Sequence, residues 1–171
     1  MRCLIFYINA LLFLLTSCLG DLDNTVVSEN DVVKAGQQVP SFVVSISDGT
    51  TFNSSQMGRK PVCIVFFNTS CSDCRKELPI VQQIYEEFSE SIQFVCISRA
   101  EDRKSIQAFW TQNKLTLPYS AQTDRKIYNL FALSSIPRLY IIDSLGTIKN
   151  AYTTKVSEKE LRKALEQLIQ Q

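Results

Sequence analysis

Two cysteines separated by two residues, Cys71 and Cys74, are the residues of this sequence best suited to chemistry. Their spacing suits a redox dithiol that exchanges with disulfides, one half of a metal site, or two buried thiols without chemistry. A site built from four cysteines needs a second pair at the same spacing, and the other cysteines stand singly. The chain also contains no histidine. We therefore expect no metal site and favour a redox dithiol.

The residues around this pair predict the junction of a buried strand and a helix. Residues 62–67 are continuously apolar, as in a central parallel strand that is covered on both faces. Apolar side chains then recur at helical spacing over residues 78–88, and Pro79 within this stretch predicts a kink. The N-terminus of a helix lowers the pKa of a cysteine placed there. We therefore expect Cys71 to be the attacking thiolate and Cys74 the resolving thiol.

The remaining patterns predict one α/β domain. Strand and helix patterns alternate, which favours a mixed β-sheet flanked by helices. A turn at residues 47–50 lies between two short strand patterns and predicts an extra N-terminal β-hairpin. Ser157 and Glu160 form a capping box at the start of the last helix. Other strands are expected at residues 93–98, 138–143 and 147–152, and other helices around residues 106–110 and 127–131.

Two further cysteines, Cys63 and Cys96, fall inside predicted strands that are rich in β-branched and aromatic residues. A buried free cysteine behaves as a small hydrophobic side chain, and this is the interpretation that we favour for both. A disulfide between Cys63 and Cys96 is the alternative interpretation.

The N-terminus has the pattern of an exported lipoprotein. Arg2 precedes an apolar stretch of 12 residues at positions 4–15, which is shorter than the roughly 20 residues of a membrane span. Residues 15–18, LTSC, resemble the bacterial lipobox, and this resemblance implies cleavage before Cys18 and acylation of Cys18. An ordinary secretory signal with a chance cysteine is the alternative.

This leader implies three parts: a lipoprotein signal peptide at residues 1–17, a lipidated flexible tether at residues 18–37 and a folded domain at residues 38–171. Lipidation would attach the protein to a membrane without spanning it. The expected location is the bacterial cell envelope, facing the periplasm or the exterior, where disulfides persist. The net charge of +1, without a basic cluster, argues against nucleic-acid binding.

Taken in order, these features resemble the thioredoxin-like superfamily, and within it the membrane-tethered thiol-disulfide oxidoreductases of the TlpA/ResA type. The resemblance covers about residues 38–171. It implies a thioredoxin-like fold and a redox-active disulfide between Cys71 and Cys74, with no other cofactor. It rests on the strand VCIVFF leading into Cys71-Ser72-Asp73-Cys74, on RKELP directly after the motif, on Ile136-Pro137 before RLYIID, and on the V-P-x-F and D-G-T segments of the hairpin.

The resemblance also implies roles for residues near the dithiol. Glu77 matches a glutamate that family members carry there, and it would tune the thiol pKa values and relay a proton. A solvated acid in the first turn of the helix is the alternative for Glu77. Pro137 would be cis, and its loop, with Ile136 and Arg138, would line the substrate groove.

Two other expected groove residues depart from the family's pattern. Ser70 stands where tryptophan is frequent, which predicts a less aromatic groove. Asp73 stands where many relatives have proline, and a carboxylate beside the dithiol is expected to raise the thiol pKa values. We therefore expect a reducing or weakly oxidising protein, with Arg75 and Arg138 as opposing charges.

The expected function is the reduction of disulfides in exported proteins by a lipid-anchored monomer. Its partners would be the disulfides and thiols of exported proteins and an upstream membrane thiol donor. A peroxiredoxin-like thiol peroxidase is the second hypothesis, because Thr69 lies two residues before Cys71 as in that group. Phe66, however, occupies the position of the proline in the peroxiredoxin pattern. A non-catalytic binding module with a thioredoxin fold is the third hypothesis.

Overall fold

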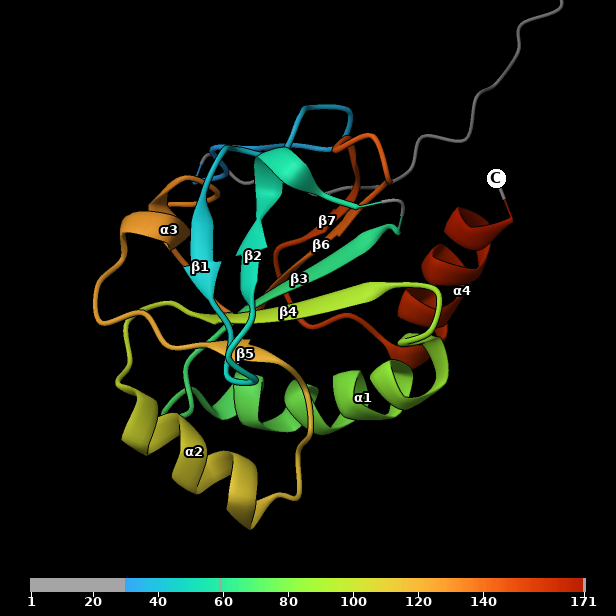
Figure 1. Ribbon diagram of the computed structural model, residues 1–171. Helices are drawn as coiled ribbons and strands as arrows, with labels where there is room; N and C mark the ends of the chain where they lie inside the picture. The colour runs from blue at the N-terminus through green and yellow to red at the C-terminus, as the bar shows by residue number, and fades with distance from the viewer. Residues whose placement is uncertain (1–29, 59, 171) are drawn as a thin grey trace, which may run out of the picture.

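The structure, a computed structural model, describes residues 30–58 and 60–170. Its strands and helices alternate along the chain as the sequence predicts (Figure 1). The elements are β1 (Val43–Ser45), β2 (Thr51–Asn53), a 3-10 turn η1 (Ser54–Gln56), β3 (Val62–Phe67), α1 (Ser72–Phe88), β4 (Gln93–Ser98), α2 (Arg103–Gln112), β5 (Tyr119–Ser120), α3 (Lys126–Asn129), β6 (Arg138–Ile142), β7 (Ile148–Tyr152) and α4 (Glu158–Ile169).

The main sheet has five strands in the order β5-β4-β3-β6-β7. The central strand β3 pairs in parallel with β4 and antiparallel with β6, so the sheet is mixed, as expected. Strands β1 and β2 form a separate antiparallel hairpin, which confirms the extra N-terminal hairpin (Figure 1).

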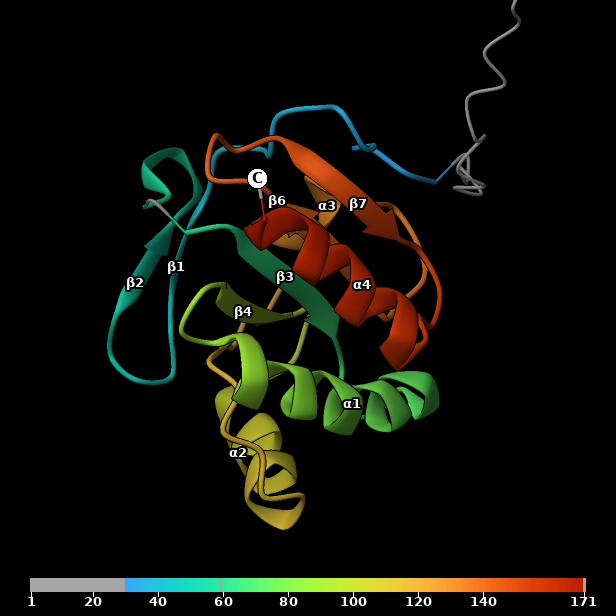
Figure 2. The ribbon, with the colours of Figure 1, turned by 90° about the vertical axis from the view of Figure 1, so that its right-hand side faces the viewer.

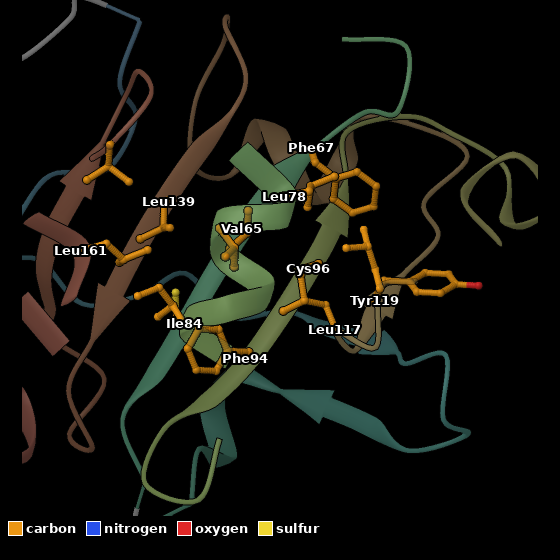
Figure 3. Close-up of a cluster of buried hydrophobic side chains, with 14 of the residues drawn as sticks. Val65, Phe67, Leu78, Ile84, Phe94, Cys96, Leu117, Tyr119, Leu139 and Leu161 are labelled. Atoms are coloured by element: carbon orange, nitrogen blue, oxygen red, sulfur yellow. The ribbon is translucent and has the colours of Figure 1, made fainter. Parts of the chain in front are cut away.

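Every residue of β3 is buried because both faces of the sheet are covered. Side chains alternate across a strand, so Cys63, Val65 and Phe67 pack on the face that carries α1, α2 and α4. Figure 3 shows Val65 and Phe67 in one cluster with Leu78 and Ile84 of α1. Ile64 and Phe66 pack on the opposite face with the hairpin and α3. Figure 2 shows α1 and α4 together on one face and α3 behind the sheet.

Side-chain caps begin the long helices. The Asp102 carboxylate accepts a hydrogen bond from the Ser105 N–H at the start of α2. Ser157 and Glu160 form the expected capping box at the start of α4. Helix α1 begins after Cys71 and continues through Pro79 to Phe88.

Part of the segment that was expected to be a tether packs against the domain. The backbone N–H groups of Val32 and Val33 donate to the Phe131 carbonyl, and Leu133 N–H donates to the Asn30 carbonyl. The Val33 side chain is buried in the core on the hairpin side of the sheet. The fold therefore includes contacts made by residues before position 38.

The predicted signal peptide and Cys18 lie outside the described residues. Within residues 30–58 and 60–170, no helix is long and apolar enough to cross a membrane.

Candidate functional site

Cys71 lies at the junction of β3 and α1 and is the N-cap residue of the helix. Its extended backbone turns the side chain back over the first helical turn, and its Sγ accepts a hydrogen bond from the Cys74 N–H at 3.4 Å. A backbone N–H donor and the positive end of the helix dipole therefore both face Cys71 Sγ. Cys71 is half-buried, so a substrate sulfur can reach it.

Cys74 lies behind Cys71, one turn into α1, and is fully buried. Burial raises the pKa of its thiol well above the ordinary value, and the hydrogen bond to the Cys71 side chain raises it further. The two sulfurs therefore differ in environment, with an accessible one at the helix start and a protonated one beneath it. This asymmetry matches the expected roles of attacking and resolving thiols.

The loop that precedes Cys71 is fixed to the end of β4. Asn68 Oδ1 accepts from the Ser70 N–H at 2.9 Å, and Asn68 Nδ2 donates to the Ala100 carbonyl at 3.1 Å. The Thr69 N–H donates to Glu101 Oε2 at 2.8 Å, and the Thr69 hydroxyl contacts the same carboxylate. These contacts hold the backbone that presents Cys71.

Glu101 is a site residue that the sequence analysis missed. Its signal was its place three residues after the end of β4. Because β4 lies parallel to β3, the ends of the two strands share one edge of the sheet, and residues after both meet there.

The loop before β6 faces the dithiol, as expected. The Ile136–Pro137 peptide bond is cis. The Ile136 carbonyl lies 3.6 Å from Cys71 Sγ and accepts its hydrogen bond when the thiol is protonated. The tertiary structure thus brings together residues that lie 65 positions apart in the chain.

Glu77 is a buried carboxyl, with only 2% of its surface exposed. Its Oε1 accepts a hydrogen bond from the Val156 N–H at 3.4 Å, while its Oε2 has no hydrogen-bond partner in the described part of the chain. Burial raises the pKa of Glu77 to about 7, although the Val156 N–H and the charge of Lys155 oppose the shift. The alternative of a solvated acid at the helix start is wrong.

Glu77 and the thiols are electrostatically coupled. The negative charge of Glu77 is one of the causes that raise the pKa of the Cys74 and Cys63 thiols. A carboxyl with a pKa near neutrality, close to a buried thiol, is suited to exchanging a proton with it.

Ser70 and Asp73 are exposed beside Cys71. The Asp73 carboxylate lies 3.7 Å from Lys76 Nζ, and both side chains are mostly in solvent. Its charge raises the pKa of Glu77. Burial and the Cys71 hydrogen bond, rather than Asp73, dominate the raised pKa of Cys74. The expected effect of Asp73 on the Cys74 thiol is therefore not among the causes of this shift.

Arg138 does not lie in the groove, which corrects the expected position. It pairs with Phe66 in the sheet and shares its face, away from α1. Its side chain is 1% exposed and forms an ion pair with Asp31. Arg75, the other expected opposing charge, stacks over the ring of Phe109 at 5.8 Å.

Cys63 and Cys96 are free and buried in adjacent strands, on the same face as Cys74. Burial raises the pKa of both thiols. The structure describes all four cysteines of residues 30–58 and 60–170 as free thiols, which is the reduced form of the dithiol.

A mixed sheet of this order, with a CxxC pair at the β3–α1 junction and a cis-proline loop opposite it, defines a thioredoxin-like protein. The pattern of the AhpC/TSA family matches residues 35–151, and the chain belongs to this family.

Thiol-disulfide oxidoreductases are homologues over most of the chain. Thiol-disulfide oxidoreductase ResA of Bacillus subtilis (strain 168) is 24% identical over 156 residues, which cover 90% of this chain and 87% of that protein. Thioredoxin-like protein YneN of the same organism is 27% identical over 138 residues, 78% of this chain and 80% of that protein.

Solved structures show the same fold. A Bacteroides thetaiotaomicron protein, provisionally described as a protein disulfide isomerase, superposes with a TM-score of 0.78 at 24% identity, covering 85% of this chain and 96% of that one. A thiol:disulfide interchange protein from Chlorobium tepidum gives a TM-score of 0.68 at 20% identity, covering 80% and 98%. At these identities the likeness establishes the fold alone.

Proposed function

We propose that the protein reduces disulfides of exported proteins through the Cys71–Cys74 dithiol. The observation that carries this proposal is the asymmetry of the two sulfurs. Cys71 is accessible and stabilised by the Cys74 N–H, whereas Cys74 is buried and its thiol pKa is raised. The homologous oxidoreductases support the same chemistry.

The reaction has two exchange steps. The Cys71 thiolate attacks one sulfur of the substrate disulfide, which forms a mixed disulfide and releases the other substrate sulfur as a thiolate. Cys74 then loses its proton and attacks Cys71 Sγ, so that the second substrate sulfur leaves. The substrate gains two electrons and two protons from the dithiol and the solvent, and a Cys71–Cys74 disulfide remains.

Glu77 is the proposed acceptor of the Cys74 proton in the second step. Its pKa of about 7 suits exchange near neutral pH. The unpartnered Oε2 leaves one acceptor position free for this proton. Ser70, Asp73, Ile136 and Pro137 form the proposed substrate groove, and an upstream membrane thiol donor would restore the dithiol.

The proposal places this domain in the bacterial cell envelope, anchored by a lipid on Cys18 and facing the periplasm or the exterior. The support is the sequence of the leader, with an apolar stretch that ends in LTSC.

A substitution at the resolving cysteine tests the exchange mechanism. Cys74→Ser is expected to stop the second step, so that mixed disulfides with envelope proteins accumulate through Cys71. These adducts are detected by non-reducing electrophoresis and disappear on treatment with dithiothreitol. The matched control Cys71→Ser is expected to trap nothing. If Cys74→Ser also traps nothing and the purified protein does not reduce insulin, the proposed function is wrong.

The same protein tests the peroxidase alternative. The Thr69 hydroxyl contacts the Glu101 carboxylate, and Phe66 is buried in β3. Neither residue supports a peroxide pocket beside Cys71. Rapid, saturable peroxide consumption that depends on Cys71 would reverse the ranking of the two functions.

A further inference from the structure

Arg138 and Asp31 form an ion pair whose side chains are buried. Their side chains are 1% and 6% exposed, and Arg138 Nη1 donates to Asp31 Oδ1. Burying two charges costs several kcal/mol for each ion, so such pairs persist only where geometry and further hydrogen bonds compensate. The other hydrogen bonds of the Arg138 guanidinium therefore indicate which part of the structure this ion pair supports.

Those hydrogen bonds go to the loop that carries the cis-proline. Arg138 Nε donates to the carbonyls of Ser134 at 3.0 Å and Ser135 at 3.2 Å, and Nη2 donates to Ser134 at 2.7 Å. The Tyr128 hydroxyl lies 2.6 Å and 2.5 Å from the same two carbonyl oxygens. The next carbonyl along the chain belongs to Ile136, which faces Cys71 Sγ.

The backbone of this loop needs such support. Ser135 has a φ of 68°, in the left-handed region that residues with a side chain seldom adopt. A strained residue keeps its conformation only where its surroundings fix it. Here the Arg138 guanidinium and the Tyr128 hydroxyl fix the loop, because both donate hydrogen bonds to the carbonyls of Ser134 and Ser135.

The counterion of Arg138 comes from outside the predicted domain. Asp31 forms an antiparallel bridge with Ala132. On either side of it, the Val32 N–H donates to the Phe131 carbonyl and the Leu133 N–H donates to the Asn30 carbonyl. The segment that leads from the N-terminus into the fold is thus bound alongside the chain that precedes the cis-proline loop.

We propose that Arg138 is a positioning residue for the cis-proline loop and that Asp31 holds Arg138 in place. The N-terminal segment is then a structural part of the active site. Loss of Asp31 leaves a buried guanidinium without its counterion, and the guanidinium and the Ser134–Ser135 carbonyls shift together. Ile136 then moves relative to Cys71. The inference rests on the proposed function for its role in substrate reduction.

Two variants of the full chain test this proposal. Asp31→Asn removes the charge of the counterion, and Arg138→Lys keeps a charge for Asp31 while removing the forked contacts to the loop. For each reduced protein, the rate of Cys71 alkylation by iodoacetamide is measured from pH 5 to pH 9, and kcat/KM is measured for insulin reduction. Both variants are expected to shift the pH profile and to lower kcat/KM about tenfold, because small displacements of reacting groups slow reactions strongly.

Control variants separate positioning from general destabilisation. Glu87→Gln removes an exposed partner of Arg162, distant from the dithiol, and is expected to leave both readouts unchanged. Asp31→Glu keeps the charge and is expected to restore most of the wild-type profile. All assays are run well below the unfolding midpoint of each variant. If either folded variant, Asp31→Asn or Arg138→Lys, has the wild-type profile and kcat/KM, the proposal is overturned.

The two readouts distinguish this proposal from the proposed function. Alkylation of Cys71 requires no disulfide substrate. If Cys74→Ser traps nothing and the wild-type protein fails to reduce insulin, the proposed function fails, and a shifted alkylation profile in both variants still supports the positioning role of Arg138.

Discussion

At the scale of the residue, the site depends on contrasts between neighbouring groups. Cys71 and Cys74 are three positions apart, yet one is accessible and the other fully buried. Glu77 continues the buried face of α1 because it lies three residues after Cys74 and four before Val81. This spacing turns Glu77 inward, and the environment there makes it a weak acid.

The raised pKa of Glu77 predicts a pH-dependent stability. The contribution of Glu77 to the free energy of unfolding is greatest below pH 4.5, where Glu77 is protonated in both states, and it is lost as the pH rises through about 7. The expected loss is roughly 3 kcal/mol, at about 1.4 kcal/mol per pH unit between the two pKa values. Glu77→Gln is expected to remove this decline. The measurement is urea unfolding of the reduced protein at pH 4.5, 6, 7 and 8.

The matched control is Glu86→Gln, an exposed carboxyl on the same helix. It is expected to keep the wild-type dependence on pH. An equal slope for wild type and Glu77→Gln between pH 4.5 and 8 contradicts the assignment of this titration to Glu77.

At the scale of the element, one buried amide joins α1 to the segment between α2 and β5. Gln82 Oε1 accepts from the backbone N–H groups of Thr116 at 2.8 Å and Leu117 at 3.1 Å. The Leu117 carbonyl in turn accepts from the indole N–H of Trp110 at 2.9 Å. This segment has little regular structure, so these side chains satisfy the backbone groups that a longer strand would pair.

Gln82→Ala is expected to destabilise the fold by about 1–3 kcal/mol, because the buried N–H of Leu117 and the partly buried N–H of Thr116 lose their acceptor. Denaturant unfolding is followed by the fluorescence of Trp110, the single tryptophan of the chain. Gln83→Ala is the control, since Gln83 is exposed on the next position of α1. A change below about 0.5 kcal/mol in Gln82→Ala, typical of surface positions, contradicts the structural role of this amide.

At the scale of the whole molecule, the N-terminal segment connects the fold to its proposed anchor. The ordered contacts reach back to Asn30 and Asp31. If Cys18 carries the lipid, residues 19–29 are the chain between lipid and fold, and even fully extended they reach only about 40 Å. The proposed anchor therefore keeps the dithiol close to the membrane surface.

The anchor itself is tested by labelling with palmitate in the native host. The full chain is expected to incorporate the label, and Cys18→Ser is expected to lose it. Cys3→Ser, which changes the other cysteine of the leader, is expected to remain labelled. Label that persists in Cys18→Ser contradicts lipidation at this position.

The sequence by itself determined the local features of this protein. The apolar run of β3, the CxxC spacing, the Ser157 capping box and the hairpin turn depend on neighbouring residues, whose geometry follows from strand and helix periods. For the same reason the sequence indicated the order of the strands and helices and the position of Cys71 at the start of α1. The resemblance supplied the cis-proline, which periodicity does not reveal.

Only the tertiary structure decided which distant groups meet. Arg138 and Asp31 are 107 positions apart, and Thr69 and Glu101 are 32 apart. No local pattern encodes such pairs, because they depend on strand register and on which face of the sheet each helix covers. The same register places Leu139 on the side of α1 and turns Arg138 to the opposite side. A residue expected in the groove is instead the support of the loop that forms it.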